Sequence, residues 1–240
     1  MLIWRPLVEA FLLPRQASLS FCRGAGDEGQ QSGREASTSG RQISVTFFSK
    51  QQSQAPTNPM KQVIIGTVGY HNLCNHSIGS VLRPELQKID WVSGVEVDEL
   101  NWGPIAIVQK FQARTEAYQR VILLSALERP GRAVGDISVF RWGGSLPDEE
   151  LIQRCVGDAV TGVTSVENLL IIGEYFKIWP EETILVDVEP GPEQAGEYFT
   201  PAMQAAIPDL IRTLQYLTVA DNGQLLTYEP LYGDTLIQEA

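Results

Sequence analysis

Apolar runs of strand length alternate with amphipathic segments of helix length from residue 62 onward. Three runs, 62–68, 120–127 and 183–188, are almost wholly apolar, which is typical of strands buried on both faces of a sheet. Segments 91–100 and 136–142 alternate more, and we expect 136–142 (DISVFRW) to be an edge strand paired with its neighbour. Helices are predicted over residues 78–88, 104–117, 165–176 and 201–217.

Strands separated by helices indicate the class of the fold. We predict a three-layer α/β/α domain with a five-stranded, mainly parallel sheet. In such sheets ligands bind at the carboxyl ends of the strands. This rule directs attention to the loop 69–79 after the first strand, to Ser125 at the end of the third, and to residues 189–191.

The first 59 residues differ in composition from the rest of the chain. Residues 18–59 are rich in Ser, Gly and Gln, with few aliphatic side chains before the short patch 43–48 (ISVTFF), so this segment is too polar to order itself. We therefore predict a disordered or leader extension over residues 1–59, a domain over 60–217, and a C-terminal tail over 218–240.

The leader admits three interpretations. Met60 stands immediately before the first strong strand, which favours a working start at Met60. An Arg- and Ser-rich leader also suits an organellar transit peptide, against which its four acidic residues count. A secretory signal is the third interpretation, although no clear small-residue cleavage site follows the apolar stretch near the start.

The formal net charge of −11 narrows the range of partners. Residues 1–59 hold six basic and four acidic side chains, so the acidity belongs to the remainder, and such a surface repels phosphate backbones. We expect no nucleic-acid partner and no membrane span, since no apolar run reaches roughly 18 residues. The three widely spaced cysteines suggest no disulfide framework. A cytoplasmic location is expected, or an organelle if the leader is a transit peptide.

One loop gathers the side chains that favour metal chemistry. His71 and His76, the two histidines of the chain, flank Cys74 in the sequence HNLCNH, and imidazole and thiolate are good ligands for zinc, copper and nickel. The spacing matches no closed four-ligand pattern, so a fourth ligand, Asp158 or Glu189, has to come from elsewhere. The alternative is that both imidazoles only form hydrogen bonds within the loop.

Other site types find less support. Gly66, Gly69 and Gly79 lack the GxGxxG spacing of a dinucleotide site, and no phosphate-binding P-loop is present. Ser125 ends a buried strand without a GxSxG context, so a small residue filling a strand end is the simpler interpretation than a nucleophile with His71 or His76 as its base.

The segments considered together resemble a known family. Residues 67–79 (TVGYHNLCNHSIG) hold Gly69 and Gly79 in the frame GxGNxLxxDDGxG; further segments that agree are 120–131, 136–142, 178–196 and 200–214. In this order they resemble the hydrogenase maturation endopeptidases, which trim a C-terminal peptide from the large subunit of nickel–iron hydrogenases. The resemblance covers residues 60–217 and implies a protein partner, the hydrogenase large subunit or another maturation client.

The resemblance also implies where a nickel site would lie. The family holds nickel with an acidic residue of its DDG loop, an Asp that ends a strand, and a later His. By frame, these positions fall on Asn75 and His76, on Ser125, and near Thr161. Asn and Ser are weak ligands without the charge that offsets desolvation of the ion.

Three functions remain open at this stage. One is a protein-binding assembly or maturation factor that has lost the usual metal ligands. Another is an active endopeptidase that uses nickel or zinc through His76, His71 and Cys74. A third, another hydrolase or a small-molecule binder, rests on the fold alone. A peptide-binding groove beside the strand 136–142 would favour a protein ligand over a small molecule.

Overall fold

The computed structural model describes residues 61–161 and 165–233. The expected leader over 1–59 lies outside the described residues, as does the end of the expected tail, residues 234–240. The strands are β1 (Val63–Thr67), β2 (Val95–Glu99), β3 (Arg120–Ala126), β4 (Ile137–Trp142), β5 (Glu182–Val188) and β6 (Glu229–Leu231). The helices are the 3-10 turn η1 (Cys74–Ser77), then α2 (Ile78–Leu86), α3 (Pro104–Gln112), α4 (Glu149–Thr161), α5 (Val166–Tyr175), α6 (Pro201–Val219) and α7 (Asn222–Leu225).

The strands form one sheet in the order β2-β1-β3-β5-β4-β6. Strands β2, β1, β3 and β5 are parallel, β4 runs antiparallel to β5, and β6 is parallel to β4. The predicted α/β/α class with a mainly parallel sheet is confirmed. The predicted strand count of five is wrong, because a sixth strand, β6, pairs with residues Phe140–Trp142 of β4. Strand β4 is therefore an edge strand over its first half only.

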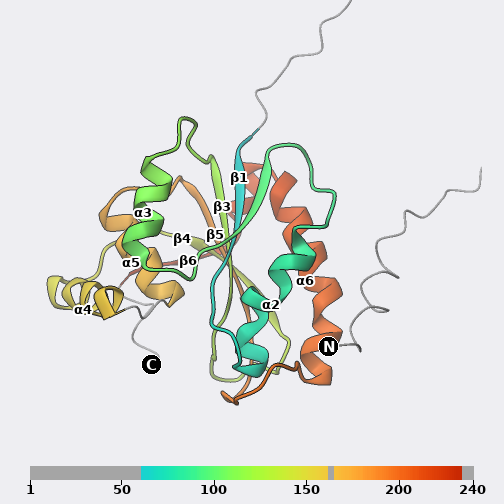
Figure 1. Cartoon of the computed structure of the whole chain (residues 1–240). Coiled ribbons are helices and arrows are strands. Elements are labelled where there is room, and N and C mark those ends of the chain that lie inside the picture. The colour runs from blue at the N-terminus through green and yellow to red at the C-terminus, as the bar shows by residue number, and fades with distance from the viewer. Residues whose placement is uncertain (1–60, 162–164, 234–240) are drawn as a thin grey trace, which may run out of the picture.

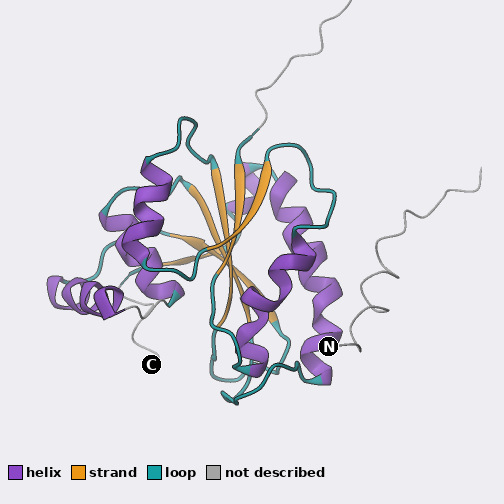
Figure 2. Ribbon diagram, in the orientation of Figure 1, coloured by secondary structure: helices purple, strands orange, loops and turns teal. Residues whose placement is uncertain are grey.

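Helices cover both faces of the sheet (Figures 1 and 2). Helices α2 and α6 pack on one face, where Leu82, Met203 and Leu210 join one buried cluster. Helices α3 and α5 pack on the other face, where Ile107 and Leu169 join a second cluster. Helix α4 lies outside this layer and packs on α5. Among the described residues no single helix is long and apolar enough to span a membrane, although the bent pair of α4 and α5 passes by length and composition together.

Local sequence signals explain where several helices begin. The Ser165 and Thr200 hydroxyls accept hydrogen bonds from the N–H groups of Asn168 and Met203, so both predicted N-caps are confirmed. Helix α4 was not predicted, although its apolar positions repeat with the helical period; only Cys155 and Ala159 of this helix are buried. Residues 218–233, expected as part of a tail, carry α7 and β6.

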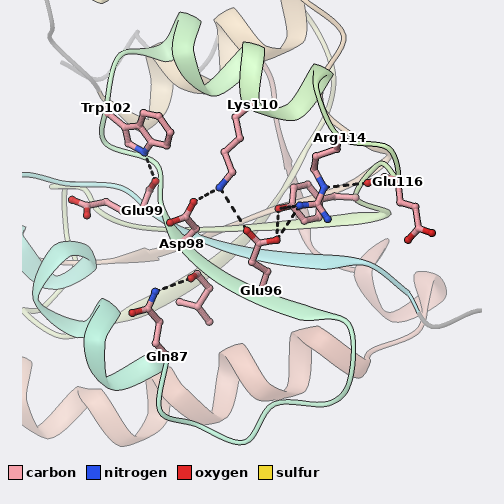
Figure 3. Close-up of polar contacts among 10 residues, drawn as sticks. Gln87, Glu96, Asp98, Glu99, Trp102, Lys110, Arg114 and Glu116 are labelled. Carbon is pink, nitrogen blue, oxygen red and sulfur yellow. Dashed lines mark hydrogen bonds and ion pairs between the residues drawn. The ribbon is translucent and has the colours of Figure 1, made fainter.

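The outer edge of β2 is covered by the protein's own side chains (Figure 3). The N–H of Leu100 bonds the Thr67 carbonyl of β1, so by strand alternation the carbonyls of Val97 and Glu99 point away from the sheet. The Gln87 amide donates to the Val97 carbonyl at 3.1 Å, and the Trp102 indole donates to the Glu99 carbonyl. Few outward backbone groups of β2 are therefore free to pair with another strand.

Charged side chains reinforce β2 on the α3 face (Figure 3). Lys110 of α3 pairs with Asp98 and with Glu96, and the Arg114 guanidinium lies 3.0 Å from a Glu96 carboxyl oxygen. The Tyr118 hydroxyl donates to the same oxygen at 2.7 Å. These contacts together form a structural ion-pair network on this side of the sheet.

Candidate functional site

The loop after β1 curls tightly at the carboxyl edge of the sheet. Asn72 and Cys74 adopt the left-handed conformation, with φ of 65° and 46°. The Leu73 N–H donates to the Ser77 hydroxyl at 2.8 Å, and the Cys74 N–H donates to the Gly196 carbonyl at 2.9 Å. The loop is therefore held both within itself and against the segment that precedes α6.

Asn75 fastens this loop to the start of α6. Its side chain is buried; the amide donates to the Pro190 carbonyl at 2.8 Å and to the Thr200 hydroxyl at 3.1 Å. Its side-chain oxygen accepts the Thr200 N–H at 2.9 Å. Both N–H donors of the amide are engaged and its oxygen accepts one hydrogen bond, so Asn75 holds the loop against the start of α6.

His76 is held by the neighbouring segment after β5. Its Nε2 atom lies 2.9 Å from the Gly191 carbonyl oxygen and 3.4 Å from a Glu128 carboxyl oxygen. A carbonyl oxygen only accepts, so Nε2 carries the proton and donates. Only Nδ1 then remains as a potential ligand atom on this imidazole.

The other two side chains of the loop point to different surroundings. His71 is largely exposed, with its Nε2 3.8 Å from a Glu99 carboxyl oxygen. Cys74 is buried against Gly196. Within residues 61–161 and 165–233, no three His, Cys, Asp or Glu side chains are grouped so that they could hold a metal ion. The structure thus does not bring His71, Cys74 and His76 together as one ligand set.

Ser125 lies beside a carboxylate that the sequence analysis did not place in the site. The register of β3 and β5 pairs Ser125 with Asp187, and both side chains are buried. Arg129 Nε lies 2.6 Å and Arg132 Nη1 lies 2.9 Å from the same Asp187 carboxyl oxygen, while the Leu127 N–H donates to the other oxygen at 3.1 Å. Burial raises the pKa of Asp187, and the two guanidinium groups oppose that rise.

Two further carboxylates, those of Glu189 and Glu167, interact with Arg129. Glu189, a predicted fourth ligand, is buried and accepts the N–H groups of Arg129 at 2.8 Å and Gly191 at 3.0 Å. Glu167 stands in the first turn of α5, and burial raises its pKa. Arg129 links these groups, because its charge opposes the pKa rise at Glu167 as well as at Asp187.

The remaining predicted positions lie on α4. The Asn168 amide lies 3.4 Å from an Asp158 carboxyl oxygen, and the Asp158 carbonyl accepts the Thr161 hydroxyl at 2.8 Å. Thr161 is exposed at the end of the helix. Neither position joins Asn75 and His76 in a ligand set within the described chain.

A nickel or zinc ion does not fit the described side chains at this edge. Both N–H groups of the Asn75 amide are engaged and its oxygen already accepts the Thr200 N–H, while His76 offers one nitrogen. The nearest buried carboxylate to Ser125 in register, Asp187, is already bound by two guanidinium groups. A divalent cation here would have to displace Arg129 and Arg132 or be repelled by them.

Arg129 and Arg132 were not predicted as site residues. They flank the turn at Pro130–Gly131 that follows a buried strand, at the edge where ligands bind in such sheets. Two basic residues in that position were a usable signal. The sequence alone does not show that they bind Asp187, because that contact depends on the strand order, which places β5 beside β3.

No protein-family model matches the sequence, and no curated protein matches it. Solved structures similar to this one include the hydrogenase maturating endopeptidase HybD from E. coli, at 19% identity over 64% of this chain and 89% of that chain, with a TM-score of 0.46. A NiFe hydrogenase maturation protease HybD from Thermococcus kodakarensis is 15% identical over 65% of this chain and 99% of that chain, with a TM-score of 0.44. Both names are those of the family that the sequence resembles.

Proposed function

We propose that this chain is a protein-binding assembly or maturation factor of the hydrogenase-maturation-endopeptidase type that performs no metal-dependent proteolysis. The observation that carries the proposal is the Asp187 carboxylate bound between Arg129 and Arg132. The carboxylate beside Ser125 is thereby neutralised by the protein's own cations, where a nickel-dependent site needs free negative charge. The order of sequence segments supports the type of partner, a hydrogenase large subunit or another maturation client.

Exposed aromatic side chains at the same edge of the sheet support a protein partner. Tyr70 follows β1, Trp102 follows β2, and Tyr198 precedes α6; their exposed fractions are 42%, 46% and 59%. Tyr and Trp are enriched at the centres of protein interfaces, where their rings bury much apolar area at low entropic cost. A partner that docks on this edge would cover these rings and the loop that holds His71.

The test combines binding and cleavage on the full chain. Purified protein is mixed with a nickel–iron hydrogenase large subunit that retains its C-terminal peptide, with and without nickel or zinc. We expect a complex whose large subunit keeps its mass. Trp102→Ala and Tyr198→Ala should each weaken binding about tenfold or more, as for an interface hot spot. Tyr175→Ala is the matched control, since Tyr175 is 55% exposed at the other end of the sheet.

Two results would contradict this proposal. Cleavage of the large subunit that depends on added nickel or zinc, and that His76→Ala abolishes, would establish the endopeptidase alternative with His76, and with His71 or Cys74, as ligands. Failure of the subunit to bind at all would remove the proposed partner. Titration of the protein with each metal alone separates these cases, because a protein with no metal site gives no saturating binding signal.

A further inference from the structure

A groove lies between β4 and α6, on the face of the sheet that α6 covers. It encloses about 640 Å³, a volume typical of a small-molecule site. The apolar part of its lining comes from Ile137 and Val139 of β4 and from Ala206 of α6. Side chains of this kind favour contact with an aliphatic group over contact with water.

Arg141 continues the β4 side of this groove. Side chains alternate along a strand, so Arg141 points to the same face as Ile137 and Val139, which pack on the α6 side of the sheet. The Nε atom of Arg141 is buried and has no hydrogen-bond partner within residues 61–161 and 165–233. A buried donor without an acceptor costs free energy, and an anion bound to this guanidinium would offset the cost.

Two tyrosines line the groove near Arg141. Tyr228 directly precedes Glu229, the registered partner of Phe140, so it lies beside Val139 on the neighbouring strand. Burial raises the pKa of the Tyr228 hydroxyl, and the nearby Tyr216 adds to the rise, so this hydroxyl stays protonated and can donate. Phenol and guanidinium groups both donate hydrogen bonds, which a carboxylate accepts.

The acidic side chains of the groove lie toward its other end. Strand β4 and helix α6 both start at the carboxyl end of β5, so they run in the same direction. Asp136 stands five residues before Arg141, which is roughly 16 Å along a strand. Asp209 lies about two helical turns before Tyr216 and forms an ion pair with Arg212. The groove is therefore acidic at one end and rich in hydrogen-bond donors at the other.

We propose that this groove binds a monocarboxylic acid with an aliphatic chain. The carboxylate accepts hydrogen bonds from Arg141, Tyr216 and Tyr228, and the chain packs along Ile137 and Val139. The chain runs toward the acidic end of the groove, where a second carboxylate would be repelled. The inference uses none of the residues that carry the proposed function and stands without it.

The test is calorimetric titration of the full 240-residue chain with decanoate, decanol and decylamine. These three compounds share one chain length and differ in the charge of the head group. Decanoate should bind at least about tenfold more tightly than the other two, because hydrogen bonds to a charged group add affinity. Octanoate and hexanoate should bind more weakly, by up to about fourfold for each methylene that no longer packs in the groove.

Two substitutions remove proposed donors. Arg141→Gln should weaken decanoate binding about tenfold or more and leave decanol binding unchanged. Tyr228→Phe keeps the ring and its packing, so it tests the hydroxyl even where Arg141→Gln does not fold, and it should weaken decanoate binding about threefold to tenfold. Tyr175→Phe is the matched control and should leave binding unchanged, since Tyr175 lies at the end of α5, outside the groove.

Every other result overturns the proposal. No binding of decanoate means that the groove takes no such ligand, and equal binding of decanoate and decanol means that it does not recognise the carboxylate. Tighter binding of decylamine assigns its selectivity to Asp136 and Asp209 instead. Decanoate binding that Arg141→Gln and Tyr228→Phe both leave unchanged places the ligand elsewhere on the protein.

Discussion

Ser125 on β3 is the registered partner of Asp187 on β5, so the carboxylate at this edge lies one strand away from the position that the sequence resemblance indicates. The surroundings of Asp187 decide what this carboxylate can bind. Arg129 and Arg132 both come from the β3–β4 connection and both reach the same Asp187 oxygen. Both guanidinium groups therefore compensate the negative charge of Asp187, which opposes binding of a further cation there.

Asp187→Ala should destabilise the fold strongly. The change leaves two guanidinium groups without their carboxylate in a buried setting, and breaking a buried ion pair from one side costs about 3–5 kcal/mol. Chemical denaturation monitored by circular dichroism measures the loss. The control is Asp209→Ala, which removes an exposed partner of Arg212 on α6 and should change the free energy of unfolding by less than about 1 kcal/mol. Equal effects of the two changes would contradict a structural role for the Asp187 network.

Asn75→Asp should weaken the protein rather than restore a metal site. A carboxylate cannot donate to the Pro190 carbonyl, and it would face that oxygen in a buried position. We expect a loss of about 1–3 kcal/mol, the cost of an unsatisfied buried group. Thermal unfolding with and without nickel measures both points. A rise in melting temperature on adding nickel to the variant would show that a carboxylate alone rebuilds the site.

Glu167 should make stability depend on pH in a defined direction. Because burial raises its folded pKa above the ordinary value, its contribution is fully favourable below the unfolded pKa and is lost as pH rises through the folded pKa. Glu167→Gln removes this loss, so the variant should gain stability relative to wild type as pH rises above about 4.5 and show no relative gain below it. Denaturation midpoints of the variant and the wild type, measured from pH 3 to pH 8, test this difference in stability. A gain that is the same at every pH would contradict a role for the buried Glu167 carboxyl group.

Gly79, one of the glycines that support the sequence resemblance, should be required for packing. A Cβ at this position would lie 2.6 Å from the Val68 carbonyl oxygen, so the start of α2 and the end of β1 would have to separate. Gly79→Ala is expected to cost about 1–3 kcal/mol. Gly157→Ala on α4 has open space around its Cβ and should instead stabilise by about 0.5–1 kcal/mol, the helix propensity of alanine over glycine. Melting temperatures of the two variants should move in opposite directions.

The sequence predicts the architecture better than the site. The apolar runs that became β1, β3 and β5, and the caps at Ser165 and Thr200, are local signals and appear in the structure where they were expected. Strand β6 was missed because three residues carry no readable period. The site depends on pairings more than 50 residues apart, such as Asp187 with Arg129, and these follow from strand order.

The two ends of the sheet differ, and the difference limits how copies of this protein can associate. At β2 the outward carbonyls of Val97 and Glu99 are occupied by Gln87 and Trp102, whereas at β4 the outward backbone groups of Ile137 are paired with no strand of the described residues. Growth of a fibre by edge addition needs an acceptor at both ends of every subunit. A subunit with one receptive end can join one neighbour through its strands and then stops. Side chains of two residues, Gln87 and Trp102, thus protect the fold against open-ended polymerisation.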